Sequence, residues 1–547
     1  MPFLVDTAAF SPLRYPIFRA VWIASFISSF GALIESVAAS WMMTSIASSA
    51  SMVTLVQAAA MSPLVLFSLL AGAIADNFDR RVLMLIMFPL MLVIAATLSV
   101  ITWLGLVTPW LLLVFTFLIA CGGTFIGPAW QSSVVDMVPR SELPAAVALN
   151  SISFNIVRTV GPAIGGLIVA AFGAAVAFAV NAVSYLGVIA VLARWRPPPA
   201  ERRLTREPIG IAMGAGVRYI AMSPDIRGVL ARSAVFGIGA IAIPALLPII
   251  ARNQSGDDAF AFGLMLGAFG IGALAAGVSI GRLRARYSAE SIVRVALGAS
   301  SLASLAVALS PIHFVTLGAL MVAGAGWVLA FASFTVAVQL SAPRWVEARA
   351  ISLYNVAAFG GLAAGSGLYG LIADRWSVDS ALLTGGAILA VGAVMGLLRP
   401  MPQVDGREPG PALRWSEPEI TLDIEPRSGP IVVTIEYRIR EDDLPEFLEL
   451  MAERRRGRLR DGARRWSLHR DLGDPELWTE RYQSPTWLEY LRHTQRRAEA
   501  DGGLSERFLA LHQGPNPPVV HRTIERQTRS VSPHAVIGQP TDPRRPF

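Results

Sequence analysis

The sequence has no lysine, one cysteine (Cys121) and six histidines among its 547 residues. A single cysteine inside an apolar segment excludes an internal disulfide and a cysteine-based metal site. Only 16% of the residues are charged, whereas soluble proteins carry about 25%. The G-x-x-x-x-G-K motif is also missing, so nothing in the sequence supports direct use of ATP. What remains is an apolar chain, 54% hydrophobic, with a mean hydropathy of +0.53.

The apolar residues are gathered into long runs. A bilayer core of about 30 Å requires about 20 apolar residues per helix. Twelve runs of this kind predict twelve transmembrane helices, near residues 18–44, 52–75, 82–104, 109–135, 144–171, 175–195, 226–251, 260–281, 291–309, 313–338, 350–373 and 378–398. The predicted fold class is an all-α membrane protein.

The arginines predict how the chain is oriented. Loops that carry Arg80 with Arg81, Arg140, or the cluster from Arg194 to Arg232 alternate with loops that carry almost none. By the positive-inside rule, both termini are predicted to be cytoplasmic, with the chain crossing the inner (plasma) membrane. Because the excess of positive charge lies in short loops between apolar runs, it predicts a lipid bilayer rather than a nucleic acid as partner.

The first half of the apolar region is repeated in the second. The segment from Gly72 to Arg81 has a weaker copy from Gly277 to Arg286, and the same offset takes Asn150 to Asn355. A single shift that superimposes several landmarks indicates a duplicated unit. The sequence therefore predicts two six-helix halves arranged as parallel repeats, an organisation typical of transporters.

Composition divides the chain further. A loop rich in Arg and Pro separates the halves, and a linker leads to a region with the pattern of a soluble α+β domain. Its expected β-α-β-β-α-β order is that of a ferredoxin-like unit on the cytoplasmic side. The predicted parts are the halves 1–195 and 226–400, the loop 196–225, the linker 401–430, the ferredoxin-like domain 431–526 and a disordered tail 527–547.

Two charged residues lie well inside apolar runs, Glu35 in the first and Arg158 in the fifth. Charges at this depth cost about 2.5–3.5 kcal/mol on insertion scales, so they are functional candidates. One interpretation makes Glu35 a protonation site coupled to transport, with Arg158 lowering or gating its proton affinity. The other is a static buried ion pair that fixes helix packing.

Uncharged polar and aromatic residues in the runs are candidates for a substrate cavity. Interhelical hydrogen bonds are the alternative explanation for the polar ones. The candidates are Gln57, Asn155, Asn181, Trp327, Phe331, Tyr354 and Asn355.

Two motifs resemble the major facilitator superfamily. The segment from Gly72 to Arg81 resembles the signature loop between helices two and three, although it departs at Asn77 and Asp79. The resemblance implies a cytoplasmic latch formed by Gly72, Asp76, Arg80 and Arg81, with Asp136 as a partner for an arginine. A second motif resembles the fifth-helix motif of antiporters and comprises Gly161, Pro162, Gly165 and Gly166.

The run from Asn181 to Leu186 and the stretch 139–150 resemble the branch with macrolide and enterobactin exporters. The resemblance implies a secondary transporter that exports small amphipathic, drug- or siderophore-like molecules by alternating access and proton antiport. It implies no enzyme activity and no cofactor. A lipid or lysolipid flippase, or an importer on the same scaffold, is the alternative.

The soluble region resembles a different family. Residues 466–493 are similar to the dimeric α/β barrel family, which includes antibiotic-biosynthesis monooxygenases. This resemblance leaves a third hypothesis, an oxygenase anchored by the membrane part. It also implies that two copies of the chain pair through this domain as a homodimer.

Overall fold

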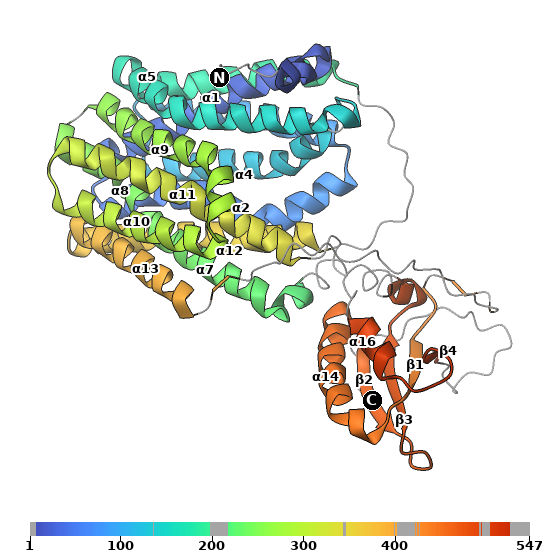
Figure 1. Ribbon diagram of the computed structural model, residues 1–547. Helices are drawn as coiled ribbons and strands as arrows, with labels where there is room; N and C mark the ends of the chain where they lie inside the picture. The colour runs from blue at the N-terminus through green and yellow to red at the C-terminus, as the bar shows by residue number, and fades with distance from the viewer. Residues whose placement is uncertain are drawn as a thin grey trace. The chain divides into compact units, whose positions relative to one another are not determined.

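The structure is a computed structural model of the chain (Figure 1). It describes residues 7–134, 136–196, 217–256, 258–342, 346–398, 400–401, 422, 424–425, 427–491, 494 and 504–525. Most of the predicted linker and all of the predicted tail lie outside these residues. The chain divides into two compact units. The first, called here the membrane unit, comprises Met1–Arg206, Gly228–Val338 and Ile351–Pro402.

Long apolar helices build the membrane unit (Figure 1). Eleven helical segments among the described residues are long and apolar enough to cross a membrane. The helices are α1 (Pro16–Ile46), α2 (Ala50–Asn77), α3 (Arg80–Trp103), α4 (Pro109–Val134), α5 (Leu143–Arg194), α7 (Pro224–Ala240), α8 (Ala242–Ser255), α9 (Ala259–Arg286), α10 (Ala289–Leu309), α11 (His313–Ser341), α12 (Glu347–Arg375) and α13 (Val378–Leu398).

The difference from the twelve predicted segments lies in α5. The predicted segments 144–171 and 175–195 run together in this element, which is counted as a single span. Inside α5, Gly173 has φ 81° and ψ 170°, a conformation that favours glycine and is not helical. In the seventh predicted segment, the helix is interrupted near Ile241, so α7 and α8 together form one span.

The outer surface of the membrane unit is apolar. Large side chains on its helices are widely exposed, for example Val93 at 58%, Val183 at 64% and Leu302 at 68%. Such a surface would be unfavourable in water and is the expected one in lipid, where helices satisfy their own backbone hydrogen bonds. The chain is an integral membrane protein.

A small antiparallel sheet lies near the C-terminus (Figure 1). Its strands are in the order β2-β3-β1-β4, and Ile431 of β1 pairs with Ser484 of β3 and Ile524 of β4. Helices follow β1 and β3, so the element order is the predicted one. The elements are β1 (Ile431–Arg438), α14 (Leu444–Asp461), β2 (Arg464–Arg470), β3 (Leu477–Ser484), α16 (Leu504–Leu511) and β4 (Val519–Ile524).

Buried and less buried side chains alternate along most of β1, and the buried ones form part of the core of this C-terminal domain. Val433 and Tyr437 are buried on one face of the sheet, where Phe447 of α14 and Phe508 of α16 pack against them. A period of two places successive side chains on opposite faces, so one face of the sheet carries the helices. This layer forms the apolar core of the domain.

Candidate functional site

Glu35 lies in a polar cluster between α1 and the second part of α5. Its side chain is 5% exposed, and its carboxylate accepts a hydrogen bond from the amide of Asn181. The same amide nitrogen lies 3.1 Å from the hydroxyl of Tyr185. In the described part of the chain, no cation pairs with Glu35. The buried carboxylate is therefore surrounded by neutral groups.

A glycine allows the two helices to meet at this cluster. A Cβ atom on Gly31 would lie 2.5 Å from the Ser184 hydroxyl and 2.8 Å from the Asn181 side-chain oxygen. Gly31 precedes Glu35 by one helical turn, so it lies on the same side of α1. The close approach of the backbones is what brings Asn181 to the carboxylate.

Arg158 is not the partner of Glu35. Its guanidinium instead lies 5.8 Å from the centre of the Trp327 ring on α11. Arg158 is partly buried, and among the described residues it has no hydrogen-bond or ion-pair partner. The ion pair considered from the sequence is therefore not formed, because the two side chains contact different helices.

Trp327 belongs to an aromatic cluster in the second half of the membrane unit. Its ring centre is 5.0 Å from that of Phe331 and 5.9 Å from that of Phe269. The Tyr354 hydroxyl donates to the Phe331 carbonyl oxygen at 3.2 Å. Of these residues, the sequence indicated Trp327, Phe331 and Tyr354. The cluster comprises Phe236, Phe269, Trp327, Phe331, Phe334 and Phe359.

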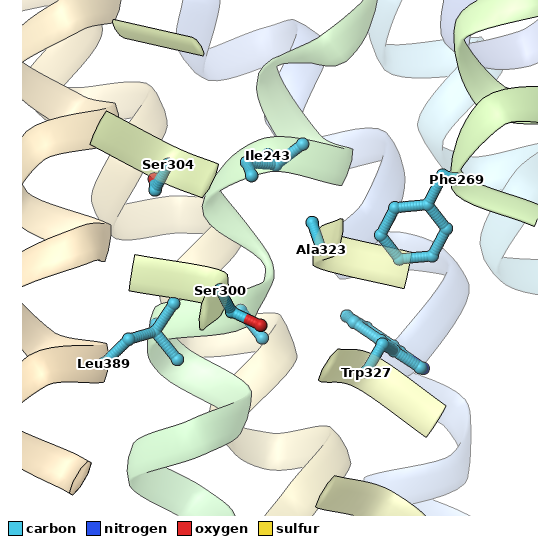
Figure 2. A pocket seen from close by; sticks show the side chains of 9 residues that line it. Ile243, Phe269, Ser300, Ser304, Ala323, Trp327 and Leu389 are labelled. Atoms are coloured by element: carbon cyan, nitrogen blue, oxygen red, sulfur yellow. The ribbon is translucent and has the colours of Figure 1, made fainter. Parts of the chain in front are cut away.

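A small cavity of about 10 Å³ adjoins the aromatic cluster. Figure 2 shows Phe269 and Trp327 on one side of it and Ser300 and Leu389 on the other. The Ser300 hydroxyl is buried and has no hydrogen-bond partner within the described residues. A volume of this size holds about one water molecule, so the cavity is too small for a transported molecule.

The remaining cavity candidates differ in their surroundings. Asn181 is fully buried beside Glu35. Gln57 and Asn355 are partly buried and make no hydrogen bond in the described part of the chain. The side chain of Asn155 lies outside the described residues. The structure thus brings Arg158, Trp327, Phe331 and Tyr354 together but does not join them to Glu35.

The antiporter-like motif packs on two sides. Gly161 and Gly165 face α1, where added Cβ atoms would meet Leu33 and Val37 at 3.0 and 3.1 Å. Gly166 faces α9, because its added Cβ would lie 2.7 Å from the Gly263 Cα. Small residues at such positions let helix backbones approach closely. The motif that contains Pro162 therefore forms a tight contact between the predicted halves.

The residues of the predicted latch lie in α2, at the start of α3 and just after α4. Arg80 donates to the Ser132 carbonyl at 3.0 Å and forms an ion pair with Asp136 at 3.2 Å. Arg81 donates to the carbonyls of Leu192 and Ala193 at the end of α5. Gly72 lies in α2, and the side chain of Asp76 is outside the described residues.

A carboxylate that the sequence analysis did not single out caps the N-terminal end of α2. Asp374, near the end of α12, accepts hydrogen bonds from the backbone N–H of Ala50 at 2.6 Å and of Ser51 at 3.1 Å. The Ser51 hydroxyl donates to the same carboxylate. A negative charge is favourable at a helix N-terminus. This contact, called here the Asp374 cap, joins residues more than 300 positions apart. The only signal in the sequence was an acid at the end of an apolar run.

A buried ion pair was also missed. Arg232 of α7 donates to both oxygens of Glu290 of α10, at 2.6 and 3.0 Å. The backbone N–H of Met401 donates to Glu290 at 2.8 Å. The pair fixes the ends of two helices beside the point where the chain leaves the membrane unit.

The C-terminal domain has its own buried charges. Glu480 is fully buried and accepts from Arg458 at 2.9 Å, with Arg454 at 3.1 Å and the Trp466 indole at 3.0 Å. Burial raises the pKa of Glu480, but Arg458 and Arg454 outweigh it and lower the pKa to about 2. Arg458 also donates to the Tyr482 hydroxyl at 2.8 Å. Two arginines thus share one buried carboxylate inside the fold.

No group of three or more His, Cys, Asp or Glu side chains that could hold a metal occurs within the described residues. Within the stretch 466–493, His469 and Trp466 have different surroundings. His469 contacts the Ser467 hydroxyl at 2.8 Å, whereas Trp466 packs on the core side. His493 lies outside the described residues.

Comparison with known proteins identifies similar transporters. A family model described as "Transmembrane secretion effector" matches residues 7–530. The chain is 24% identical over 258 residues to the staphyloferrin A transporter of Staphylococcus aureus (strain NCTC 8325 / PS 47), covering 46% of this chain and 64% of that protein. The match thus spans less than two thirds of that relative. The chain is also 25% identical over 399 residues to the enterobactin exporter EntS of Citrobacter koseri, and this match covers 70% of this chain and 92% of that protein.

Solved structures share the fold of the membrane unit. A bacterial homologue of the human lysosomal transporter Spinster, in an inward-facing and unoccupied conformation, superimposes with a TM-score of 0.56 at 13% identity. The superposition covers 71% of this chain and 95% of that one. At this identity the likeness concerns the fold alone.

Proposed function

Because the chain belongs to the transmembrane secretion effector family of the major facilitator superfamily, we propose that it is a proton-coupled exporter of small amphipathic molecules. It is a transporter and not an enzyme. The proposed cycle is alternating access, in which two halves rock around a central site. The observation that carries the proposal is Glu35, a buried carboxylate without a cationic partner in the described part of the chain.

We propose twelve spans arranged as two six-helix repeats. The non-helical Gly173 supports this count, because it divides α5 into 143–172 and 174–194, each long enough to cross a bilayer. The tight contact of Gly166 with Gly263 supports two bodies that meet along a smooth small-residue surface.

The proposed orientation has both termini in the cytoplasm. Arg80 and Arg81, the first two residues of α3, support this side as the cytoplasmic one. On this assignment the Arg80 and Arg81 contacts form the cytoplasmic latch with Asp136, with Asp76 as a further member. The Asp374 cap then closes the opposite, external end.

Glu35 is proposed as the proton carrier. A carboxylate at bilayer depth is costly when charged, and Glu35 is surrounded by the neutral groups of Asn181 and Tyr185. Protonation would neutralise its charge, since no cationic side chain pairs with it among the described residues. Arg158 does not contact Glu35, so any part that it plays in coupling would be indirect.

The proposed cargo is drug- or siderophore-like. The names of the relatives support the siderophore class, since one carries staphyloferrin A and another exports enterobactin. Gln57, Asn355, Tyr354 and the aromatic cluster are proposed to line the cavity. Asn155 and Asn181 complete the proposed set. Lipid flipping and import on the same scaffold remain outcomes of the transport test below.

The C-terminal domain is proposed to be ferredoxin-like and to pair with a second copy. The strand order β2-β3-β1-β4, with helices after β1 and β3, supports the ferredoxin-like assignment. Helices cover one face of the sheet, and the other face carries the half-buried polar side chains of Thr434 and Glu436. This second face is the one proposed to pair with the sheet of another copy.

The test is proton movement in proteoliposomes that hold the purified protein and a pH-sensitive dye. Lipophilic drugs and siderophores are added, and substrate-dependent proton flux is expected for the wild type. Glu35→Gln should abolish this flux, because an amide cannot exchange a proton, while substrate binding persists.

Asp379→Asn is the matched control, since this acid lies exposed in the first turn of α13. It should transport like the wild type. Normal coupling in Glu35→Gln would remove Glu35 from the mechanism. Absence of flux with every compound would contradict proton-coupled export of these classes and favour lipid flipping.

A further inference from the structure

Arg158 carries a charge that the described part of the chain leaves unneutralised. It lies 15 residues after the start of α5, about 22 Å along the helix axis, and so near mid-bilayer. Two other arginines of the membrane unit have acidic partners: Arg80 pairs with Asp136 and Arg232 pairs with Glu290. A charge at this depth is costly unless it is paired or functional.

The guanidinium faces an aromatic surface instead of an acid. Trp327 lies within cation–π distance, and Phe331 and Phe269 extend the surface beyond it. Arg158 and Trp327 come from different halves of the membrane unit, so their contact lies between the two proposed moving bodies. Both side chains are only partly buried, which leaves them accessible to a ligand.

We infer that Arg158 and Trp327 recognise a substrate that carries an anionic group beside an aromatic ring. A guanidinium presents a planar fork of donors that matches a carboxylate, and the indole offers a face for stacking. The anion would supply the counter-charge that Arg158 lacks among the described residues. The same positive charge disfavours cationic cargo. This inference rests on the proposed transport function and names the chemical class of its cargo.

The test is equilibrium binding of two matched probes, 1-naphthoate and its neutral amide 1-naphthamide, to the full-length protein in detergent. Empty micelles give the background. The wild type should bind the carboxylate at least about tenfold more tightly. Arg158→Gln should remove this preference without changing amide binding, and Arg158→Lys should retain part of it. Trp327→Leu should weaken the binding of both probes to a similar extent, because both carry the naphthalene ring.

Arg375→Gln is the matched control. Arg375 stacks over Trp376 at 5.9 Å, a similar pair at an exposed helix end. This variant should keep the wild-type preference. The inference is overturned if the wild type binds both probes equally or binds neither, or if Arg158→Gln weakens both to the same extent.

A transport assay separates this inference from the proposed function. Substrate-dependent proton flux with a neutral cargo, and no preference for its anionic analogue, would leave export intact and overturn the anion site. Naphthoate preference that depends on Arg158, without proton flux, would support the site and contradict proton-coupled export.

Discussion

Arg158 of the membrane unit and Arg458 of the C-terminal domain are both withdrawn from water, but their surroundings are opposite. Arg458 donates to Glu480 and Tyr482 and stacks 4.0 Å over the Tyr482 ring. The Arg158 guanidinium lies over the Trp327 ring and has no hydrogen-bond or ion-pair partner among the described residues. Arg458 therefore has an acidic partner, whereas no acidic partner of Arg158 is found in the described part of the chain.

The difference separates a structural charge from a functional one. A buried ion pair adds little net stability, but removing one partner is strongly destabilising. The Arg458 network should therefore respond to mutation through unfolding. Arg158 has no acidic partner among the described residues, so its replacement should change ligand binding while the fold persists. Replacing other charged residues should show whether each one stabilises the fold, as Arg458 does, or acts in transport, as proposed for Arg158.

The largest effect is expected for Glu480→Gln. The amide leaves Arg458 and Arg454 buried without a counter-charge, which should destabilise the C-terminal domain by about 3–5 kcal/mol. Hydrogen exchange of the β1 and β3 amides, measured in the full-length protein, should become much faster. Protection in the membrane unit should not change.

A matched control and a pH signature sharpen this prediction. Glu436→Gln changes a 40%-exposed carboxylate on the same sheet and should leave exchange unaltered. Because the pKa of Glu480 is lowered to about 2, its stabilisation is complete above about pH 4.5 and is lost as the pH falls toward 2. Glu480→Gln should lack this acid-dependent step. Equal acid sensitivity of the variant and the wild type would contradict the assignment.

An intermediate effect is expected for Asp374→Asn. The change removes a negative charge from the N-terminus of α2, worth about 1 kcal/mol. On the proposed assignment, the equilibrium between the externally closed and the externally open conformation should shift about fivefold toward the open one. A cysteine replacing the buried Thr54, in a Cys121→Ser background, should react correspondingly faster with an impermeant maleimide.

Asp379→Asn again serves as the control, because it removes an exposed acid at another helix start. Its labelling rate should match that of the parent. If Asp374→Asn also leaves the rate unchanged, the Asp374 cap has no part in closing this end.

The sequence predicted the features that depend on local pattern. Apolar runs located the helices of the membrane unit, and alternation located β1, where Val433 and Tyr437 face the core. The break predicted between residues 171 and 175 coincides with Gly173, where the backbone of α5 is not helical. The two predicted segments are nevertheless counted as one span, because helix continues on both sides of this glycine.

Pairing between distant side chains could not be predicted. Sequence position gives the depth of Glu35 and Arg158 along their helices, but not the direction in which each side chain points. Similar depth suggested a pair, whereas the structure directs Glu35 to Asn181 and Arg158 to Trp327. Asp374 and Glu290 were missed for the same reason, since their partners lie far away in sequence.

The smallest effect on stability is expected for Asp136→Asn. Arg80 and Asp136 form an ion pair in which the side chains are 37% and 34% exposed. Exposed pairs contribute about 0–1 kcal/mol, and Arg80 keeps its hydrogen bond to the Ser132 carbonyl. The thermal midpoint should therefore hardly move, whereas transport should slow if the pair latches the cytoplasmic side. High salt should reduce the difference in transport rate between variant and wild type, because it screens exposed charges. A large loss of stability with unchanged transport would place Asp136 with Glu480 as a structural charge.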